Sequence, residues 1–170
     1  MGKKTLILAS ILILVIITVI WIYGSTYHSA RKQYNEGHSA SEEIAKKEGK
    51  LTVIDDVATY NADQQYHIIS GRRNNNDKIY VWVPQTTEEK NKKIIVKKQE
   101  DGITSSQALK YVQSKYEVTK LISVKIGMDN NIPIWEVKYR DELNRYTFDY
   151  VQFSTGEIIK HMALKNLTSE

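Results

Sequence analysis

The sequence predicts an α+β protein with an N-terminal transmembrane helix and two tandem modules, each with one helix packed on an antiparallel sheet. Three observations predict this fold class. An uncharged apolar run lies near the start, two helix-start signals each precede four strand-like runs, and residue patterns recur at an offset of about 65–70 residues. The chain has 170 residues and no cysteine, so packing rather than disulfide bonds must stabilise an exported form of it.

The membrane segment is the clearest single signal in the sequence. Residues 6–23 carry no charge, and only Ser10 and Thr18 interrupt their apolar character. At about 1.5 Å per helical residue, this run spans roughly 27 Å, which is close to the hydrocarbon core of a thin bilayer. We therefore predict a cytoplasmic tail over residues 1–4, a membrane anchor over residues 5–23 and a stalk over residues 24–37.

The flanking charges predict the orientation of this anchor. Lys3 and Lys4 precede the apolar run, whereas residues 24–30 contain neither Lys nor Arg. The positive-inside rule then places the N-terminus in the cytoplasm and the C-terminal modules on the extracytoplasmic side of the cell membrane, with a single pass. A cleaved signal peptide is the alternative, but its apolar region is usually shorter and small residues precede its cleavage site.

The first predicted module covers residues 38–100. Ser39 and Glu42 have the spacing of a capping box, which predicts a short helix ending near Gly49. Four strand-like runs follow this helix, at Leu51–Tyr60, Gln65–Arg72, Lys78–Val83 and Lys92–Gln99.

The second predicted module covers residues 101–170 and repeats this plan. Thr104 and Gln107 form a second capping box before apolar residues at helical spacing. Strand-like runs follow at Lys120–Ile126, Pro133–Tyr139, Arg145–Phe153 and Glu157–Leu164. We interpret the repeat as a diverged duplication. Because a cysteine-free module of roughly 65 residues is marginally stable alone, we expect the two modules to pack against each other.

The sequence contains no recognisable catalytic, metal or cofactor motif. Its four histidines lack zinc-ligand spacing and there is no cysteine. His67 is better explained as a packed or surface histidine. Residues 129–131 (Asp-Asn-Asn) are better explained as a hairpin turn than as a calcium loop. The 24 basic and 20 acidic residues form no nucleic-acid footprint. We predict a protein that is not an enzyme and binds no cofactor, metal or nucleic acid.

Two features are candidates for binding a partner. Tyr80 and Trp82 share one face of the third strand, and such rings are frequent at interface hot spots; the alternative is that they belong to the core. Lys92 and Lys93 belong to a basic stretch around residues 94–96 (Ile-Ile-Val). This stretch could bind anionic groups, or it could be a solvated strand whose charges protect an apolar run from aggregation.

The second module resembles the PepSY domain. The resemblance rests on residues 135–137 (Trp-Glu-Val) and on a final hairpin over residues 151–159 that contains Thr155-Gly156-Glu157. Gln152 stands where that family usually has Asp, and Phe153 stands where it has a small residue. The layout of a short tail, one span and two such modules resembles the TseB (YpmB) family of Bacillales. This resemblance implies cystatin-like modules.

The family resemblance also implies a function. It implies a non-catalytic regulator of cell wall elongation whose partner is a penicillin-binding protein or another wall-synthesis membrane protein. An alternative is a PepSY-type protease inhibitor or a chaperone-like module at the cell surface. A further alternative is an envelope sensor, although a tail of four residues leaves it no cytoplasmic output domain of its own.

Overall fold

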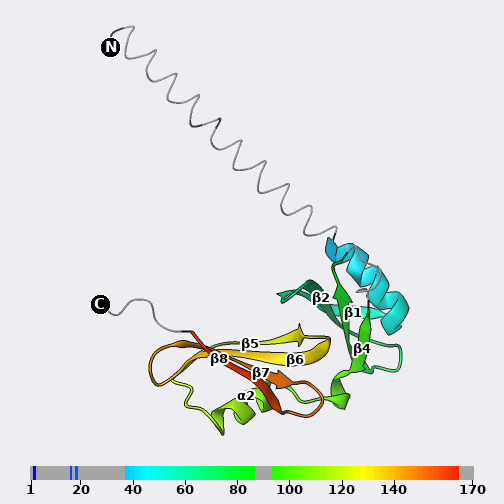
Figure 1. The fold of residues 1–170 in the computed structure, drawn as a ribbon. Coiled ribbons are helices and arrows are strands. Elements are labelled where there is room, and N and C mark those ends of the chain that lie inside the picture. The colour runs from blue at the N-terminus through cyan, green and yellow to red at the C-terminus, as the bar shows by residue number, and fades with distance from the viewer. Residues whose placement is uncertain (1, 3–15, 17, 19–36, 87–92, 165–170) are drawn as a thin grey trace. The chain divides into compact units, whose positions relative to one another are not determined.

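A computed structural model describes residues 2, 16, 18, 37–86 and 93–164, and the chain divides into two compact units, Met1–Ala40 and Ser41–Glu170. The second unit contains nearly all of the described elements (Figure 1). The predicted anchor lies outside the described residues except for Ile16 and Thr18, which are helical and exposed. Within the described part of the chain, no helix is both long enough and apolar enough to cross a membrane.

The strands form two four-stranded antiparallel sheets, each in sequential order. The first sheet contains β1 (Val53–Asn61), β2 (Gln65–Arg72), β3 (Lys78–Pro84) and β4 (Ile95–Lys98). The short 3-10 helix η2 (Gln99–Asp101) then leads to α2 (Ser105–Gln113). The second sheet contains β5 (Lys120–Asp129), β6 (Ile132–Arg140), β7 (Tyr146–Gln152) and β8 (Ile158–Ala163). The predicted α+β class with two antiparallel sheets is confirmed.

The strand registers support the duplication. Ile68 of β2 pairs with Trp82 of β3, and the equivalent pair in the second sheet is Glu136 of β6 with Tyr150 of β7. Both first strands also carry an irregularity near their start, between Ile54 and Asp56 in β1 and between Leu121 and Ser123 in β5. A shared bulge position is a family-level feature of sheets rather than a random defect.

The two predicted capping boxes have different outcomes. Thr104 caps α2 as predicted, because its side chain accepts a hydrogen bond from the backbone N–H of Gln107 while the Gln107 side chain bonds back to it. Ser39 does not cap its helix, because residues 37 and 38 are already helical and Ser39 lies inside the helix over residues 37–49. A capping box permits a helix start, but a serine costs only a few tenths of a kcal/mol inside a helix and does not prevent it from extending upstream.

Residues with positive φ form the turns of two hairpins at positions that the sequence predicted. Asn130 and Asn131 adopt φ values of 47° and 61° between β5 and β6, which is the geometry of a two-residue hairpin turn. Gly156 adopts a φ of 77° between β7 and β8, and its N–H donates to the carbonyl of Gln152. Asp129 ends β5 and Asn130 and Asn131 form the turn, so the predicted hairpin turn at residues 129–131 is confirmed.

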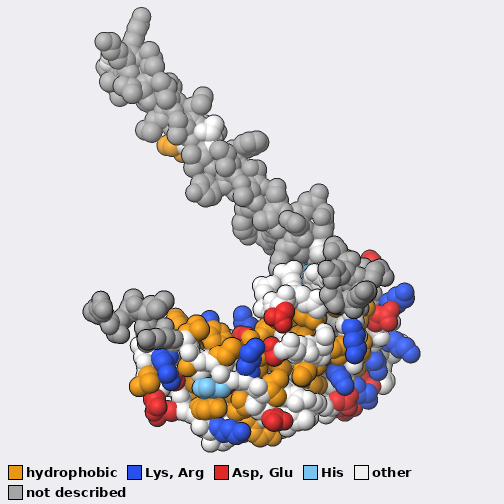
Figure 2. All heavy atoms as spheres, viewed as in Figure 1, with side chains coloured by type: hydrophobic (Ala, Val, Ile, Leu, Met, Phe, Trp, Pro, Cys, Tyr) orange, Lys and Arg blue, Asp and Glu red, His pale blue; other side chains and the backbone are white. Residues whose placement is uncertain are grey.

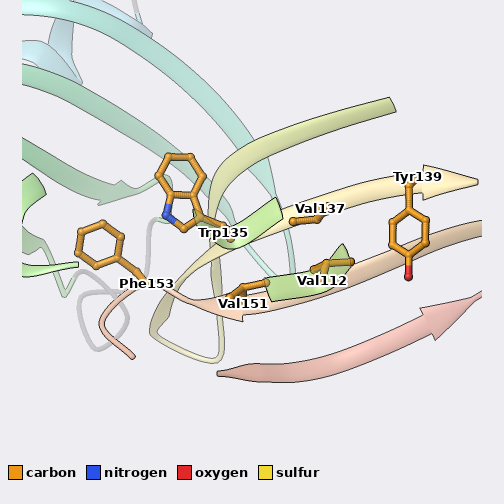
Figure 3. Close-up of a cluster of buried hydrophobic side chains, with 7 residues drawn as sticks. Val112, Trp135, Val137, Tyr139, Val151 and Phe153 are labelled. Carbon is orange, nitrogen blue, oxygen red and sulfur yellow. The ribbon is translucent and has the colours of Figure 1, made fainter. Parts of the chain in front are cut away.

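Each sheet packs one face on a helix. Under the second sheet, Val112 of α2 packs with Val137 and Tyr139 of β6 and with Val151 of β7 (Figure 3). Under the first sheet, Ala45 of the helix over residues 37–49 belongs to a separate cluster of buried aliphatic side chains, which comprises Ala45, Leu51, Ile69, Ile79, Val81 and Val83.

A third cluster joins the two sheets. It combines Tyr60, Tyr66, Ile68 and Trp82 of the first sheet with Met128 and Ile134 of the second. The Trp82 indole N–H donates to the carbonyl oxygen of Gly127 at 2.9 Å, and the Tyr60 hydroxyl donates to Glu136 Oε2 at 3.0 Å. Burial, followed by hydrogen bonding to Tyr150, raises the pKa of Tyr60. The expectation that the two modules pack against each other is confirmed.

Gly127 leaves room for the Tyr60 ring, and replacing it should weaken this junction. A Cβ atom at position 127 would lie 2.7 Å from that ring, so Gly127→Ala should lower the free energy of unfolding by about 1–3 kcal/mol. Urea unfolding measures this change. In a Tyr60→Ala protein the same substitution should cost much less, and an equal cost in both proteins would contradict the packing argument.

Asp141 organises the turn between β6 and β7. Its carboxylate accepts hydrogen bonds from the backbone N–H groups of Leu143 and Arg145, the Arg145 Nε–H and the Thr147 hydroxyl. Burial opposes ionisation, but hydrogen bonds from the Arg145 backbone and side chain outweigh it, so the Asp141 pKa lies below its ordinary value of 3.8. The charged form is therefore the one that stabilises the fold.

The depressed pKa of Asp141 predicts a pH dependence of stability. A carboxyl whose pKa is lower in the folded protein stabilises it above the unfolded pKa, and this contribution is lost as the pH falls through the folded pKa. Asp141→Asn should cost about 1–3 kcal/mol at neutral pH. Urea unfolding between pH 7 and pH 2 should show a shallower acid loss in this variant. Parallel pH profiles below pH 4 would contradict the role assigned to Asp141.

Candidate functional site

Strand β3 is buried on both faces, which determines where Tyr80 and Trp82 lie. Ile79, Val81 and Val83 face the helix of the first module, whereas Tyr80 and Trp82 face the second module. Trp82 is 0% exposed, so its side chain has no surface to offer an external partner. The structure thus supports the core alternative for Trp82, and Tyr80 is half-buried beside it.

Four aromatic rings meet at this junction. Tyr80 packs edge-on against Trp135 with ring centroids 6.2 Å apart and against Phe153 at 6.0 Å, while Trp82 lies 5.9 Å from Phe153. Edge-to-face pairs of this kind add about 0.5–1.5 kcal/mol each beyond the burial of their area. Burial also raises the pKa of the Tyr80 hydroxyl, so it stays protonated at neutral pH.

The Phe153 ring packs between the two sheets and contacts side chains of both. It is 1% exposed, and its ring fills the space beside Gly102, where an added Cβ would lie 2.3 Å from a ring carbon. The Phe153 carbonyl also accepts a hydrogen bond from the Ile103 N–H. A small residue at position 153 would leave this space empty.

An open groove of about 490 Å³ runs beside β4 and is the candidate binding site. The chain from Lys93 to Lys97 forms one wall, with the apolar residues 94–96 between the two lysines. The second module forms the other wall, which consists of Asn131, Ile132, Pro133, Gln152, Phe153 and Ser154. Lys93 therefore lines this groove, and its role in binding a partner stays a prediction, whereas Lys92 lies outside the described residues.

The wall of the groove formed by β4 carries basic side chains and is the edge of the first sheet. Lys93 and Lys97 are exposed, and neither forms an ion pair with a carboxylate of the described residues. Lys98, by contrast, is neutralised by Asp77 at 3.1 Å and Glu100 at 3.0 Å, and hydrogen bonds to these carboxylates raise its pKa. Because β4 is the last strand of its sheet, one side of its backbone can accept an extended segment.

A second polar network lies under the second sheet. Asp149 is completely buried and accepts a hydrogen bond from the Tyr139 hydroxyl at 2.7 Å, while His161 Nδ1 lies 2.6 Å from its other oxygen. Tyr116 stacks on the His161 ring at 4.2 Å. Burial, and then Asp149, raise the pKa of Tyr139. The contact between His161 and Asp149 links the side chains of β8 and β7.

The structure also bears on His67 and on metal binding. His67 is 6% exposed and lies 2.8 Å from the Ser41 hydroxyl through its Nδ1 atom, so it is a packed histidine. Over the described ranges, no three His, Asp or Glu side chains form a group that could hold a metal ion.

Sequence reasoning missed the second wall of the groove. Ile132 and Pro133 begin β6, and Gln152 ends β7, so nothing local to either strand indicates a site. Only the docking of the two sheets brings them opposite β4. The feature that indicates this wall is the 38% exposure of the apolar Ile132 side chain. Exposure is known only from the folded chain, so the sequence could not supply it.

Together, the two sheets and the groove beside β4 define a two-module α+β protein with a candidate binding groove. Comparison with known proteins gives the family. Residues 40–84 match the model of the "Cell wall elongation regulator TseB-like domain". The chain is 35% identical over 162 residues to the "Probable cell wall elongation regulator TseB" of Bacillus subtilis (strain 168), covering 95% of this chain and 99% of that protein.

A solved structure agrees with the sequence match. The YpmB protein from Bacillus subtilis is 34% identical and has a TM-score of 0.71, over 76% of this chain and 98% of that one. The chain belongs to the TseB family of cell wall elongation regulators. The predicted resemblance is therefore confirmed, and membership in this family supports a regulatory role.

Phe153 should be essential for joining the two sheets. Phe153→Ala removes a ring that contacts both sheets and should lower the free energy of unfolding by about 3–5 kcal/mol. Leu143→Ala is a suitable control, because Leu143 is 61% exposed and its truncation should change stability by less than about 0.5 kcal/mol. Thermal and urea unfolding compare the two variants. If both substitutions changed the free energy of unfolding by the same small amount, Phe153 would not be needed to join the two sheets.

Proposed function

We propose that the protein is a membrane-anchored, extracytoplasmic regulator of cell wall elongation that acts without catalysis by binding a penicillin-binding protein. The observation that carries this proposal is the 35% identity to a TseB protein over 95% of the chain. The uncharged run over residues 6–23 supports the membrane anchor. The similarity of the repeated modules to PepSY sequences supports a cystatin-like fold for each.

The groove beside β4 is the contact site that we propose for this partner. Lys93 and Lys97, which form no ion pair with a carboxylate of residues 37–86 or 93–164, flank an apolar strand edge, and Ile132 exposes 38% of its surface on the opposite wall. This arrangement suits an extended segment with apolar side chains and nearby carboxylates, because backbone hydrogen bonds give affinity and flanking charges give register. Tyr80 and Trp82 support the groove from within the junction rather than contacting the partner.

The open edge of β4 also favours a second candidate function. A protease inhibitor or chaperone-like module would bind an extended peptide along the same edge by adding a strand to the first sheet. The two functions differ in the identity of the captured protein. A secreted protease inhibited by the purified protein would favour the second candidate.

Charge reversal in the groove tests the proposed contact. In the full chain, Lys93→Glu with Lys97→Glu should abolish in-cell photo-crosslinking from position 132 to a penicillin-binding protein and reproduce the cell width and β-lactam sensitivity of a deletion strain. Lys46→Glu with Lys47→Glu is the matched control, because both lysines are exposed on the helix of the first module. Both proteins should keep their unfolding midpoints, since exposed substitutions usually change stability by less than about 0.5 kcal/mol.

Three results would count against this proposal. The groove variant could crosslink as efficiently as the control, the captured protein could be a protease, or deletion could leave both cell width and β-lactam sensitivity unchanged. The first result removes the groove from the proposed contact, the second favours the inhibitor function, and the third removes the role in wall elongation.

A further inference from the structure

The second sheet has one face that no helix covers. Its other face packs on α2 through Val137, Tyr139 and Val151, and α2 lies on one side of β5–β8 only (Figure 1). Strand pairing arranges this face in three rows, and only the third row packs partly against the first module, through the contacts of Glu136 and Tyr150 with Tyr60 and its cluster. The rows are Lys120, Arg140 and Tyr146; Ser123, Lys138, Phe148 and Met162; and Lys125, Glu136, Tyr150 and Lys160. We name these eleven residues the basic–aromatic face.

The basic–aromatic face has a large excess of positive charge. It contains five cations, Lys120, Lys125, Lys138, Arg140 and Lys160, and one carboxylate, Glu136. Glu136 already accepts a hydrogen bond from Tyr60 at 3.0 Å. Asp129 partly neutralises Lys160 at 3.3 Å, whereas the other four cations have no ion pair with a carboxylate in the described part of the chain. Figure 2 shows one side of this unit, on which Lys and Arg side chains lie among hydrophobic and acidic ones.

Aromatic rings hold these cations in place without neutralising them. The Arg140 guanidinium carbon lies 3.3 Å from the centroid of the Tyr146 ring. Lys138 Nζ lies 5.0 Å from the centroid of Phe148, and Lys160 Nζ lies 5.1 Å from that of Tyr150. Such contacts contribute about 0.5–1 kcal/mol each at exposed sites. They restrict the motion of the cations, which lowers the entropy cost of binding an anion.

The spacing of the cations suits a repeating anion. Lys138 and Arg140 are two residues apart on β6, so they are about 6.7 Å apart along the strand. Lys120 lies directly opposite Arg140 on the neighbouring strand, at a Cβ separation of about 4.5–5.5 Å. Arg140 donates a hydrogen bond from Nη1 to the Asn144 carbonyl at 2.7 Å, and a guanidinium has further donors in a fork geometry that matches a phosphate.

We propose that the basic–aromatic face binds a linear, phosphate-bearing polymer. A flexible polymer can follow a broad sheet face, whereas a folded acidic protein would need a complementary surface for the same contact. Insertion into a bilayer is less suitable, because an inserting surface presents its rings to the lipid and the rings here lie beneath the cations. This binding is independent of the groove and of the function proposed above.

Binding of long-chain inorganic polyphosphate to the full-length protein in detergent tests the proposal. Fluorescence anisotropy should detect saturable binding that weakens steeply with salt, because bound cations release counterions. Lys138→Gln with Arg140→Gln should weaken binding at least about tenfold and reduce the slope of log K against log salt by about 1.5. Lys46→Gln with Lys47→Gln removes two exposed cations from the first module and should change neither value.

A second variant separates positioning from charge. Tyr146→Leu retains every cation but removes the ring under Arg140, so it should weaken polyphosphate binding several-fold and leave the salt slope unchanged. Tyr146 is 40% exposed, so the variant should fold. If the double Gln variant failed to fold, amide chemical shifts of the unmodified protein titrated with polyphosphate would locate the binding site, and shifts confined to β5–β8 are expected.

The outcomes that overturn the proposal are distinct. Polyphosphate could fail to bind saturably, the control variant could lose as much polyphosphate affinity as the double Gln variant, or the amide chemical-shift changes could lie on the first module. Equal affinity for poly-glutamate would show a general acid-binding surface. Tighter binding to vesicles of phosphatidylglycerol and phosphatidylcholine, lost in the same Gln variant, would assign the face to the membrane. None of these results bears on the groove, whose variants test the wall-enzyme partner separately.

Discussion

The rest of the structure depends on the burial of β3 on both faces. A strand of an antiparallel sheet usually has one face on a helix and one in solvent. Here Val81 packs under the helix of the first module while Trp82, one residue later, is completely buried against the second. A buried indole N–H needs a hydrogen-bond acceptor, and the Trp82 N–H donates to the Gly127 carbonyl oxygen at 2.9 Å. The two modules are thereby joined by a shared cluster of buried side chains.

This shared core determines which surfaces remain for function. Tyr80, Trp82 and Phe153 are used in the junction, so the aromatic residues that most resemble a partner site stabilise the fold instead. The surfaces left open differ in chemistry. The groove beside β4 offers a strand edge with apolar and basic neighbours, whereas the uncovered face of the second sheet offers cations held on aromatic rings. A regulatory role requires surfaces of this kind, since the effect of a regulator depends on what it binds.

Local patterns predicted most of the strands. The run Gln65–Arg72 is β2 with the same limits, and β3 ends at Pro84 as its missing N–H requires. Thr104 begins α2 because a capping box and the apolar spacing of the helix agree there. Ser39 shows the limit of such signals, because the motif is present but the helix extends past it. A capping motif changes the energy of a helix start by about 1 kcal/mol, which flanking contacts can exceed.

The sequence alone therefore determined the class of the fold, its repeated plan and its family. Alternation with a period of two, Asn and Gly at positions of positive φ, and the Thr155-Gly156-Glu157 hairpin are all local features. Only the tertiary structure decided which face of β3 meets the second module, that Ile132 lies opposite Lys93, and that Arg140 stacks on Tyr146. These pairs are brought together by strand register and by the docking of the two sheets. Both are non-local, because each depends on the packing of the whole chain and not on any short segment.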